Sequence, residues 1–153
     1  MRKIILTESQ AKLLLEEVDK NDTIQKLIFC NPYDIEFKVS RSNIDLPVLI
    51  PIIGGKEINE RYVKVSFEEI HPDNNTHYVL HIEVNPKLRR LGIAYKIYLS
   101  LILKDYPICN LYPLSEEIKK LWLKLANESG IVVSDLINKD GNKIGIEAYL
   151  DVK

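Results

Sequence analysis

The segment from His77 to Leu101 constrains this chain more than any other, because a short basic loop joins a strand-like pattern to a helix-like pattern. Side chains from His77 to Val84 alternate between a more apolar and a less apolar face, as in a strand. After Gly92, apolar residues recur at the helical positions 93, 97 and 101. A loop between a strand end and a helix start suits a phosphate, because its amides and the first helical amides are free to donate.

The composition of this loop adds charge and space for such a ligand. Arg89 and Arg90 supply positive charge that matches phosphate oxygens. Gly92 lets the backbone approach a ligand closely, and the small side chain of Ala94 does not obstruct it. The same pattern also fits an ordinary strand, turn and helix whose arginines are solvated, so the residues alone leave both interpretations open.

The spacing Val84-x-Pro86-x-x-Arg89-x-x-Gly92-x-Ala94 resembles the acetyl-CoA-binding signature of the GNAT superfamily of N-acetyltransferases, over about a tenth of the chain. The resemblance implies that the amides of Leu88 to Ala94 hold the pyrophosphate of coenzyme A. It also implies that backbone groups of Ile82 and Val84 run beside the pantetheine arm. The residues implied in binding are Ile82, Val84, Leu88, Arg89, Arg90, Leu91, Gly92, Ile93 and Ala94. Asn110 is a further candidate, either orienting water or the pantetheine amide or capping a strand end.

The composition is typical of a soluble globular domain with a sizeable core, since the 153 residues are 46% hydrophobic and 28% charged. The net charge of −1 gives no global field that favours nucleic acid or an anionic membrane, so neither partner is expected. A local basic cluster suits a small anionic ligand instead; its members are Lys87, Arg89, Arg90 and Lys96. The longest apolar run, at 46–53, is too short to span a bilayer and contains prolines.

The cysteine and histidine residues indicate neither a disulfide nor a metal site. Cys30 and Cys109 have no metal-like spacing, which favours a reducing compartment. Cys109 lies in an apolar string, and we expect a buried thiol there rather than a nucleophile. His71 and His77 flank a turn without an evident third ligand, so no metal is expected. The first residues turn polar too early for a secretory signal, which favours a cytoplasmic location, or host cytoplasm or virion for a phage-encoded protein.

Periodicity and turn residues predict the order of elements along the chain. Helices are expected at 8–20, at 93–104 and from a Ser115 cap to a stop at Gly130. Strands are expected at 33–40, 61–70, 77–84, 108–112, 131–137 and 143–152. Residues 21–32 fit either a short helix or a strand, and residues 41–60 are the least readable stretch.

This order predicts an α/β (α+β) fold with a mixed, mostly antiparallel twisted sheet flanked by helices, in a single domain over residues 1–153. It resembles the GNAT order of elements, from which the stretch at 41–60 departs as a possible insertion. A structureless loop of that length is uncommon. The stretch either shapes the acceptor pocket or a dimer contact, or it covers an exposed edge of the core.

Acetylation of an amine requires that the amine lose a proton, that the thioester carbonyl be polarised and that the leaving thiolate be protonated. Glu83 and His81 lie on the less apolar face of the strand that ends at the loop. Either side chain can accept the amine proton there, directly or through water. Alternatively, Glu83 pairs with a neighbouring lysine and His81 is an ordinary hydrogen-bonded strand residue.

The acid that protonates the thiolate is less clearly marked. The resemblance implies a tyrosine where Ala126 stands, and Ile131 replaces an aromatic residue of the same motif. Tyr112 can substitute, as can Tyr98, although helical spacing favours a core position for Tyr98, as it does for Trp122. A third alternative is that no side chain protonates the thiolate and that the reaction depends on positioning and electrostatics.

Three hypotheses follow for the function. The first is an N-acetyltransferase in which a primary amine of a small molecule or peptide attacks acetyl-CoA directly in a ternary complex, without a metal. A homodimer is compatible with this hypothesis but does not follow from the residues. The second is a catalytically inactive GNAT-like binding or structural module, which is phage-encoded if the capped segment at 6–18 reflects its resemblance to phage proteins. The third is an unrelated α+β protein with a chance motif.

Overall fold

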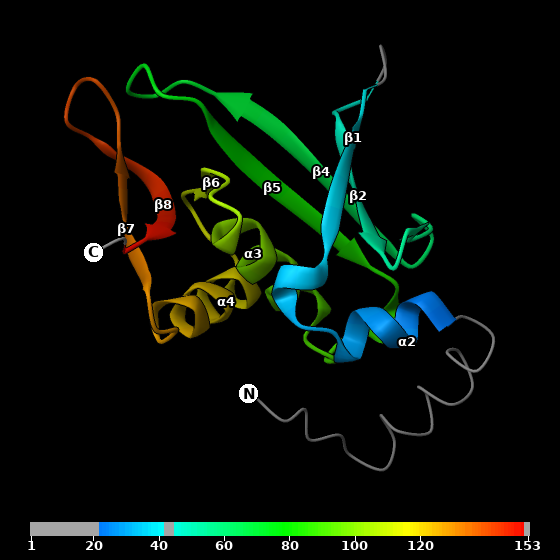
Figure 1. The fold of residues 1–153 in the computed structure, drawn as a ribbon. Helices are drawn as coiled ribbons and strands as arrows, with labels where there is room; N and C mark the ends of the chain where they lie inside the picture. The colour runs from blue at the N-terminus through cyan, green and yellow to red at the C-terminus, as the bar shows by residue number, and fades with distance from the viewer. Residues whose placement is uncertain (1–21, 42–44, 152–153) are drawn as a thin grey trace. The chain divides into compact units, whose positions relative to one another are not determined.

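The computed structural model describes residues 22–41 and 45–151, and Figure 1 traces its elements in order along the chain. The helix expected at 8–20 lies outside these residues. The described helices are α2 (Asp22–Phe29), α3 (Ile93–Leu103) and α4 (Glu116–Ala126), with short 3-10 turns η1 (Pro32–Asp34) and η2 (Pro86–Leu88). The strands are β1 (Glu36–Ser40), β2 (Val48–Ile53), β3 (Lys56–Glu57), β4 (Val63–Ile70), β5 (His77–Val84), β6 (Ile108–Leu111), β7 (Ile131–Ile137) and β8 (Lys143–Leu150).

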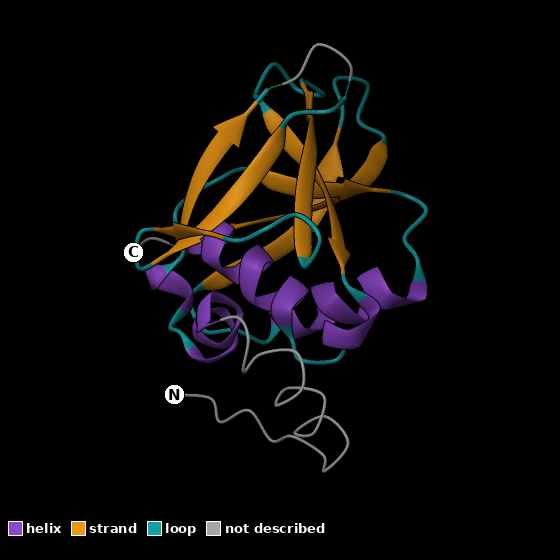
Figure 2. Ribbon diagram, turned by 90° about the vertical axis from the view of Figure 1, so that its right-hand side faces the viewer, coloured by secondary structure: helices purple, strands orange, loops and turns teal. Residues whose placement is uncertain are grey.

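The described strands form one eight-stranded, mostly antiparallel sheet with the order β1-β2-β4-β5-β6-β8-β7, and β3 pairs with β2. Figure 2 draws the strands in orange and the helices in purple. Strand β5 pairs with β6 in parallel, with Tyr78 opposite Ile108 and Val79 opposite Cys109. Strand β6 then pairs with β8 in the antiparallel direction. The expectation of a mixed, mostly antiparallel α/β fold is therefore confirmed.

The chain divides into two compact units. Among the described residues, the first unit comprises 22–41, 45–66 and 82–97, and the second comprises 67–81 and 98–151. The loop after β5 belongs to the first unit, whereas β6, α4, β7 and β8 belong to the second. A single domain over the whole chain stays a prediction.

The stretch at 41–60 is not a structureless loop, because it contains strands β2 and β3. Its status as a possible insertion stays a prediction. Strand β2 is paired on both sides, with β1 and with β4. All six of its residues are apolar, but burial still alternates along it, so one face is more covered than the other. Pro51 lacks an amide to donate, and its carbonyl accepts from the amide of Ile58 at 2.9 Å.

Two neighbouring segments complete this part of the chain. Residues 22–29 form the helix α2, which is one of the two alternatives that the sequence left open at 21–32. Strand β1 begins three residues later than expected, because Asn31 caps a 3-10 turn by accepting from the amide of Tyr33 at 3.0 Å. Tyr33 is therefore exposed instead of lying on a buried face. Ile35, directly after the turn, is fully buried.

Helix α4 begins as predicted, with the hydroxyl of Ser115 accepting from the amide of Ile118 at 3.2 Å. Its buried stripe consists of Leu121, Trp122 and Leu125. The helix ends at Ala126, and Gly130 is not its stop. Gly130 instead has a left-handed backbone (φ 81°) at the turn into β7.

The core of the second unit is organised around the buried side chain of Asn110 on β6. Its Oδ1 accepts from the hydroxyl of Tyr98 at 2.8 Å and from Nε1 of Trp122 at 2.9 Å. Its Nδ2 donates to the carbonyl of Leu80 at 3.0 Å. The two aromatic rings meet edge to face, with centroids 5.8 Å apart. The predicted core positions of Tyr98 and Trp122 are thus confirmed, and one amide side chain connects β5, β6, α3 and α4.

We expect Asn110→Leu to destabilise the protein by on the order of 3 kcal/mol or more, because it leaves several buried polar groups without partners. Urea unfolding followed by Trp122 fluorescence measures the loss. Asn142→Leu is the matched control, since Asn142 is exposed in the β7–β8 turn, and should change stability by about 0.5 kcal/mol at most. Equal effects of the two variants would show that the Asn110 network contributes little.

Candidate functional site

The loop after β5 begins with a 3-10 turn that uses several of its own amides. The side chain of Asn85 accepts from the amide of Lys87 at 3.0 Å. The amide of Leu88 donates to the main-chain carbonyl of Asn85 at 2.8 Å, and the amide of Arg89 donates to the carbonyl of Pro86 at 3.4 Å. Both amides therefore have acceptors within the turn, which argues against a contact with a pyrophosphate; their role in binding stays a prediction.

The amides that follow are differently placed. Within the residues that the structure describes, none accepts a hydrogen bond from the amides of Leu91, Gly92, Ile93 and Ala94. The first bond of α3 runs from the amide of Lys96 to the carbonyl of Gly92 at 3.0 Å. These four amides, called here the amide cradle, belong to the first two residues of α3 and the two residues before it, where orphan donors are expected.

Gly92 is the residue of the amide cradle with the most open surroundings. Arg90 and Gly92 both have a left-handed backbone, with φ of 69° and 76°. A Cβ added at Gly92 would meet no atom within 4 Å. The side chains of Leu88, Leu91 and Ile93 are buried, so apolar anchors hold the loop in place while its backbone stays near the surface.

Polar contacts fix the loop to the end of β5 and to the start of β4. The Nε of Arg89 donates to the carbonyl of Val84 at 3.3 Å. The main-chain amide of Asn85 donates to the carbonyl of Tyr62 at 2.8 Å, and Nδ2 of Asn85 donates to the carbonyl of Arg61 at 3.2 Å. Arg89 and Arg90 are exposed. The exposed guanidinium group of Arg89 places positive charge close to the amide cradle.

Lys96 does not belong with the basic ligand cluster. Its Nζ donates to the carbonyls of Ile28 at 2.5 Å and Cys30 at 2.8 Å, at the C-terminal end of α2. Burial lowers the pKa of Lys96, and the neighbouring Cys30 opposes this effect. The expectation that this charge serves the ligand directly is therefore wrong, because two main-chain carbonyls already hold the ammonium group.

The two candidate bases lie where the sequence placed them along β5. Glu83 and His81 are both exposed, whereas Ile82 and Val84 between and after them are partly buried. An exposed carboxylate is accessible to water and to a ligand amine. The roles of Glu83 and His81 as bases, and of Ile82 and Val84 in binding, stay predictions.

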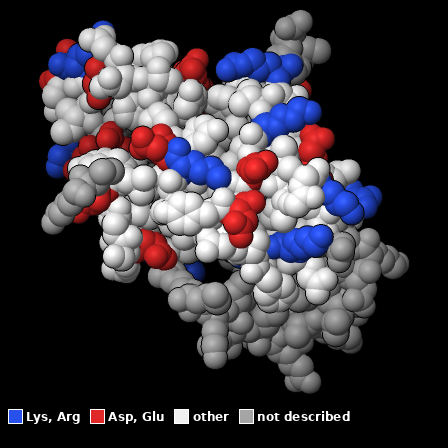
Figure 3. Space-filling model, viewed as in Figure 1, with Lys and Arg blue, Asp and Glu red and all other residues white. Residues whose placement is uncertain are grey.

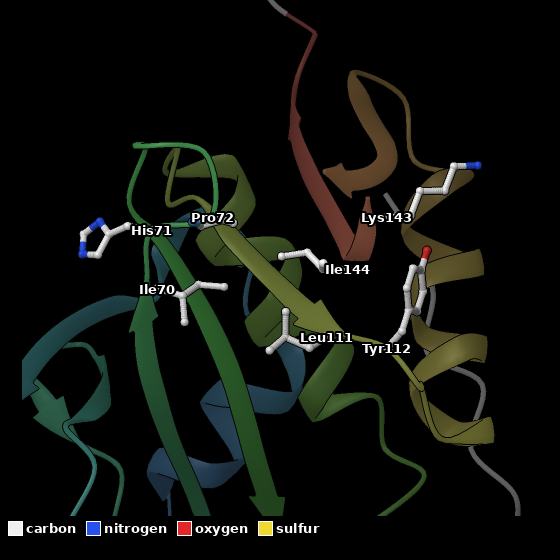
Figure 4. Close-up of a pocket in the computed structure, with 7 residues that line it drawn as sticks. All are labelled: Ile70, His71, Pro72, Leu111, Tyr112, Lys143 and Ile144. Carbon is white, nitrogen blue, oxygen red and sulfur yellow. The ribbon is translucent and has the colours of Figure 1, made fainter. Parts of the chain in front are cut away.

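Tyr112 lies in a separate groove of the second unit, directly after β6. The groove has a volume of about 590 Å³, and Figure 4 shows the side chains of Ile70, Leu111 and Ile144 converging in it. The remaining residues that line it are His71, Pro72, Tyr112 and Lys143. The hydroxyl of Tyr112 donates to Oδ1 of Asp135 at 2.6 Å. This bond raises the pKa of Tyr112 and lowers that of Asp135.

The same carboxylate also meets a cation, since Nζ of Lys143 lies 3.4 Å from Oδ2 of Asp135. An acid must release its proton to the leaving thiolate, but Asp135 holds the proton on Tyr112. The geometry therefore weakens the assignment of Tyr112 as acid while keeping the side chain exposed and within reach of a ligand in the groove.

The other candidate polar groups are buried. The hydroxyl of Tyr98 donates to Asn110, and burial raises its pKa above the usual range. Asn110 has three internal partners, so its side chain serves the core. Burial raises the pKa of Cys109 to about 12, which keeps a fully buried thiol protonated. The expectation that Cys109 is a buried thiol is confirmed.

Histidine side chains show no metal-like arrangement. His77 is nearly buried, with Nε2 lying 3.4 Å from Oε2 of Glu147 and Nδ1 lying 3.1 Å from the carbonyl of Asn75. Across residues 22–41 and 45–151, no cluster of three or more potential ligands could hold a metal ion.

Basic and acidic side chains are interspersed on the face drawn in Figure 3.

Sequence reasoning missed two of these contacts. The Asp135 carboxylate is separated from Tyr112 by 23 positions, and no local pattern joins the two. The Lys96 contact to Cys30 spans 66 positions, and only its place in the first turn of a helix, where a cation is unfavourable, marks the residue as unusual.

Comparisons with known proteins do not add to this geometry. No protein-family model matches the chain. A search of curated proteins found no match either. In the part of the chain that the structure describes, no helix is both long and apolar enough to cross a membrane. Any functional assignment therefore depends on the residues and contacts described above.

We expect Asp135→Asn to lower the pKa of Tyr112 toward the ordinary value of about 10, because the carboxylate that retains its proton is removed. The change is measured by titration of the ¹³Cζ resonance of tyrosine. Tyr112→Phe assigns the signal, and Asp140→Asn in the exposed β7–β8 turn is the matched charge control. An unchanged Tyr112 titration in the Asp135 variant would contradict the described bond.

Proposed function

We propose that this protein binds acetyl-CoA through the amide cradle and transfers its acetyl group to a primary amine. The observation that supports the proposal is that the amides of Leu91 to Ala94, at the start of α3 and close to exposed arginines, have no acceptor among the described residues. A helix start with free amides attracts anions through both its donors and its dipole. The resemblance of the same residues to the GNAT signature makes the pyrophosphate of coenzyme A the preferred anion.

The arrangement of β5, the loop and α3 supports the same ligand. A parallel pair such as β5 and β6 is joined by a crossover, and the ligands of such units bind at the carboxyl end of the first strand. The amide cradle lies at this position in the chain. Pantetheine would extend along the backbone of Ile82 and Val84, as the resemblance implies.

The proposed reaction is a direct attack within a ternary complex. The neutral amine nitrogen attacks the thioester carbon, a new C–N bond forms, and the C–S bond breaks to release the coenzyme A thiolate. Glu83 takes the proton lost by the amine, directly or through water. The thiolate takes a proton from solvent, since the proton of Tyr112 is held by Asp135. Positioning then supplies most of the rate enhancement.

The hydrogen bond between Tyr112 and Asp135 favours a second function, which is binding of coenzyme A without catalysis. With the tyrosine proton retained and Ala126 at the position of the expected acid, the fold is also suited to binding coenzyme A without catalysis. Such a module would hold the ligand in the amide cradle but release no thiol in the presence of amines. Binding and turnover therefore need separate measurements.

We expect acetyl-CoA at tenfold over its Kd to raise the melting temperature by roughly 3–5 °C, because a ligand of the folded state stabilises it by about 1.4 kcal/mol at that excess. Gly92→Val should abolish the shift by blocking the approach to the amide cradle. Gly141→Val is the matched control, since Gly141 has a similar left-handed backbone (φ 83°) and open surroundings. A shift that survives in the Gly92 variant would refute the proposed place of binding.

We expect release of free thiol from acetyl-CoA when a panel of primary amines is added, and a fall of about 10²-fold or more in kcat for Glu83→Gln if the carboxylate is the base. The binding shift should persist in that variant, because Glu83 does not belong to the amide cradle. Binding without thiol release across the panel would support the inactive module instead of the enzyme.

A further inference from the structure

Lys96 connects the helix that carries the amide cradle to the end of another helix. It lies in the first turn of α3, and its amide bonds to Gly92 at 3.0 Å. Its ammonium group reaches the last turn of α2 and donates to the carbonyls of Ile28 and Cys30. All of these residues belong to the first compact unit. One side chain therefore caps α2 and is anchored directly beside the amide cradle.

The positive charge of Lys96 is destabilised by its place in α3 and stabilised by its contacts with α2. A cation in the first turn of a helix is opposed by the positive end of the helix dipole, and partial burial removes water from it. The carbonyls at the C-terminal end of α2 offset part of this cost. An anion at the start of α3 would offset the rest, because it reverses the potential around the first turn. The contact between Lys96 and α2 should then be stronger when the amide cradle is occupied.

We propose that Lys96 couples anion binding at the amide cradle to the docking of the C-terminal end of α2, so that bound acetyl-CoA holds α2 more firmly. This inference rests on the proposed function for the identity of the ligand. Lys96 acts as a positioning residue, since its ammonium group is committed to α2. The coupling is reciprocal, so docking of α2 also increases the affinity for the anion.

Cys30 reports the state of this contact. Its carbonyl is one of the two acceptors of Lys96, and its Sγ donates to the carbonyl of Leu27 at 3.4 Å. The thiol is partly buried, whereas the chain's other cysteine, Cys109, is fully buried. Alkylation of Cys30 should therefore follow local opening of the α2 end.

The experiment measures the alkylation rate of Cys30 by iodoacetamide, with and without saturating acetyl-CoA, in the wild type, Lys96→Met and Lys96→Arg. Peptide mass spectrometry separates Cys30 from Cys109. Repeating the rates over a range of pH separates a change in thiolate fraction from a change in opening. Hydrogen exchange of the Cys30 amide, which bonds to Lys26 at 2.8 Å, provides a second readout.

In the wild type, acetyl-CoA should slow both alkylation and exchange about fivefold or more, the lower end of typical coupling between sites. Lys96→Met should show fast rates that acetyl-CoA does not change, and Lys96→Arg should restore part of the effect. A rate in the wild type that acetyl-CoA leaves unchanged would overturn the coupling. A faster rate would also overturn it, because Lys96 would then be leaving α2 for the phosphate.

The outcome is distinguishable from failure of the proposed function. If acetyl-CoA produces no rise in the melting temperature of the wild type, the proposed ligand is wrong, and inorganic pyrophosphate tests the coupling with the anion alone. If the melting temperature rises while Cys30 is unaffected, the ligand assignment stands and the coupling is refuted. If Lys96→Met does not fold, the wild type and Lys96→Arg still decide the question.

Discussion

The parallel pairing of β5 with β6 is the constraint on which the proposed site depends. Parallel neighbours cannot be joined by a tight turn, so the chain must leave the end of β5 and return through a crossover that here contains α3. The left-handed backbone at Arg90 and Gly92 redirects the chain into that helix. The sheet topology therefore requires a helix to begin here, and with it amides that have no acceptor among the described residues.

The interior of the second unit depends on a polar group where an apolar one would be ordinary. The side chain of Asn110 donates to the carbonyl of Leu80 on the neighbouring strand β5. The backbone beside Asn110 is also closely approached, because a Cβ added at Gly145 would lie 2.3 Å from the Asn110 carbonyl oxygen. The hydrogen bonds of the Asn110 side chain and the absence of a side chain at Gly145 together determine how β6, β8, α3 and α4 pack.

The sequence predicted those elements whose signals are local. Strand β5 was predictable because its faces alternate in polarity, and α4 because Ser115 precedes an apolar stripe. Strand β2 was not, because six apolar residues hide alternation and Pro51 argues against a strand. The amide cradle was predicted in part, since a 3-10 turn that consumes two amides leaves no clear mark in the sequence. The contacts of Lys96 and Asp135 are set by tertiary packing, which residue spacing does not encode.

The place of β7 at one end of the described strand order has a consequence for association between chains. An edge strand presents unpaired amides and carbonyls that can template the addition of another strand. Asp135 is exposed near the middle of β7, and its carboxylate is kept ionised by the Tyr112 hydroxyl and by Lys143. Charged side chains on a strand at the end of a sheet disfavour pairing with a strand of a second molecule. We therefore expect the carboxylate that retains the Tyr112 proton also to lower the tendency of β7 to pair with another chain.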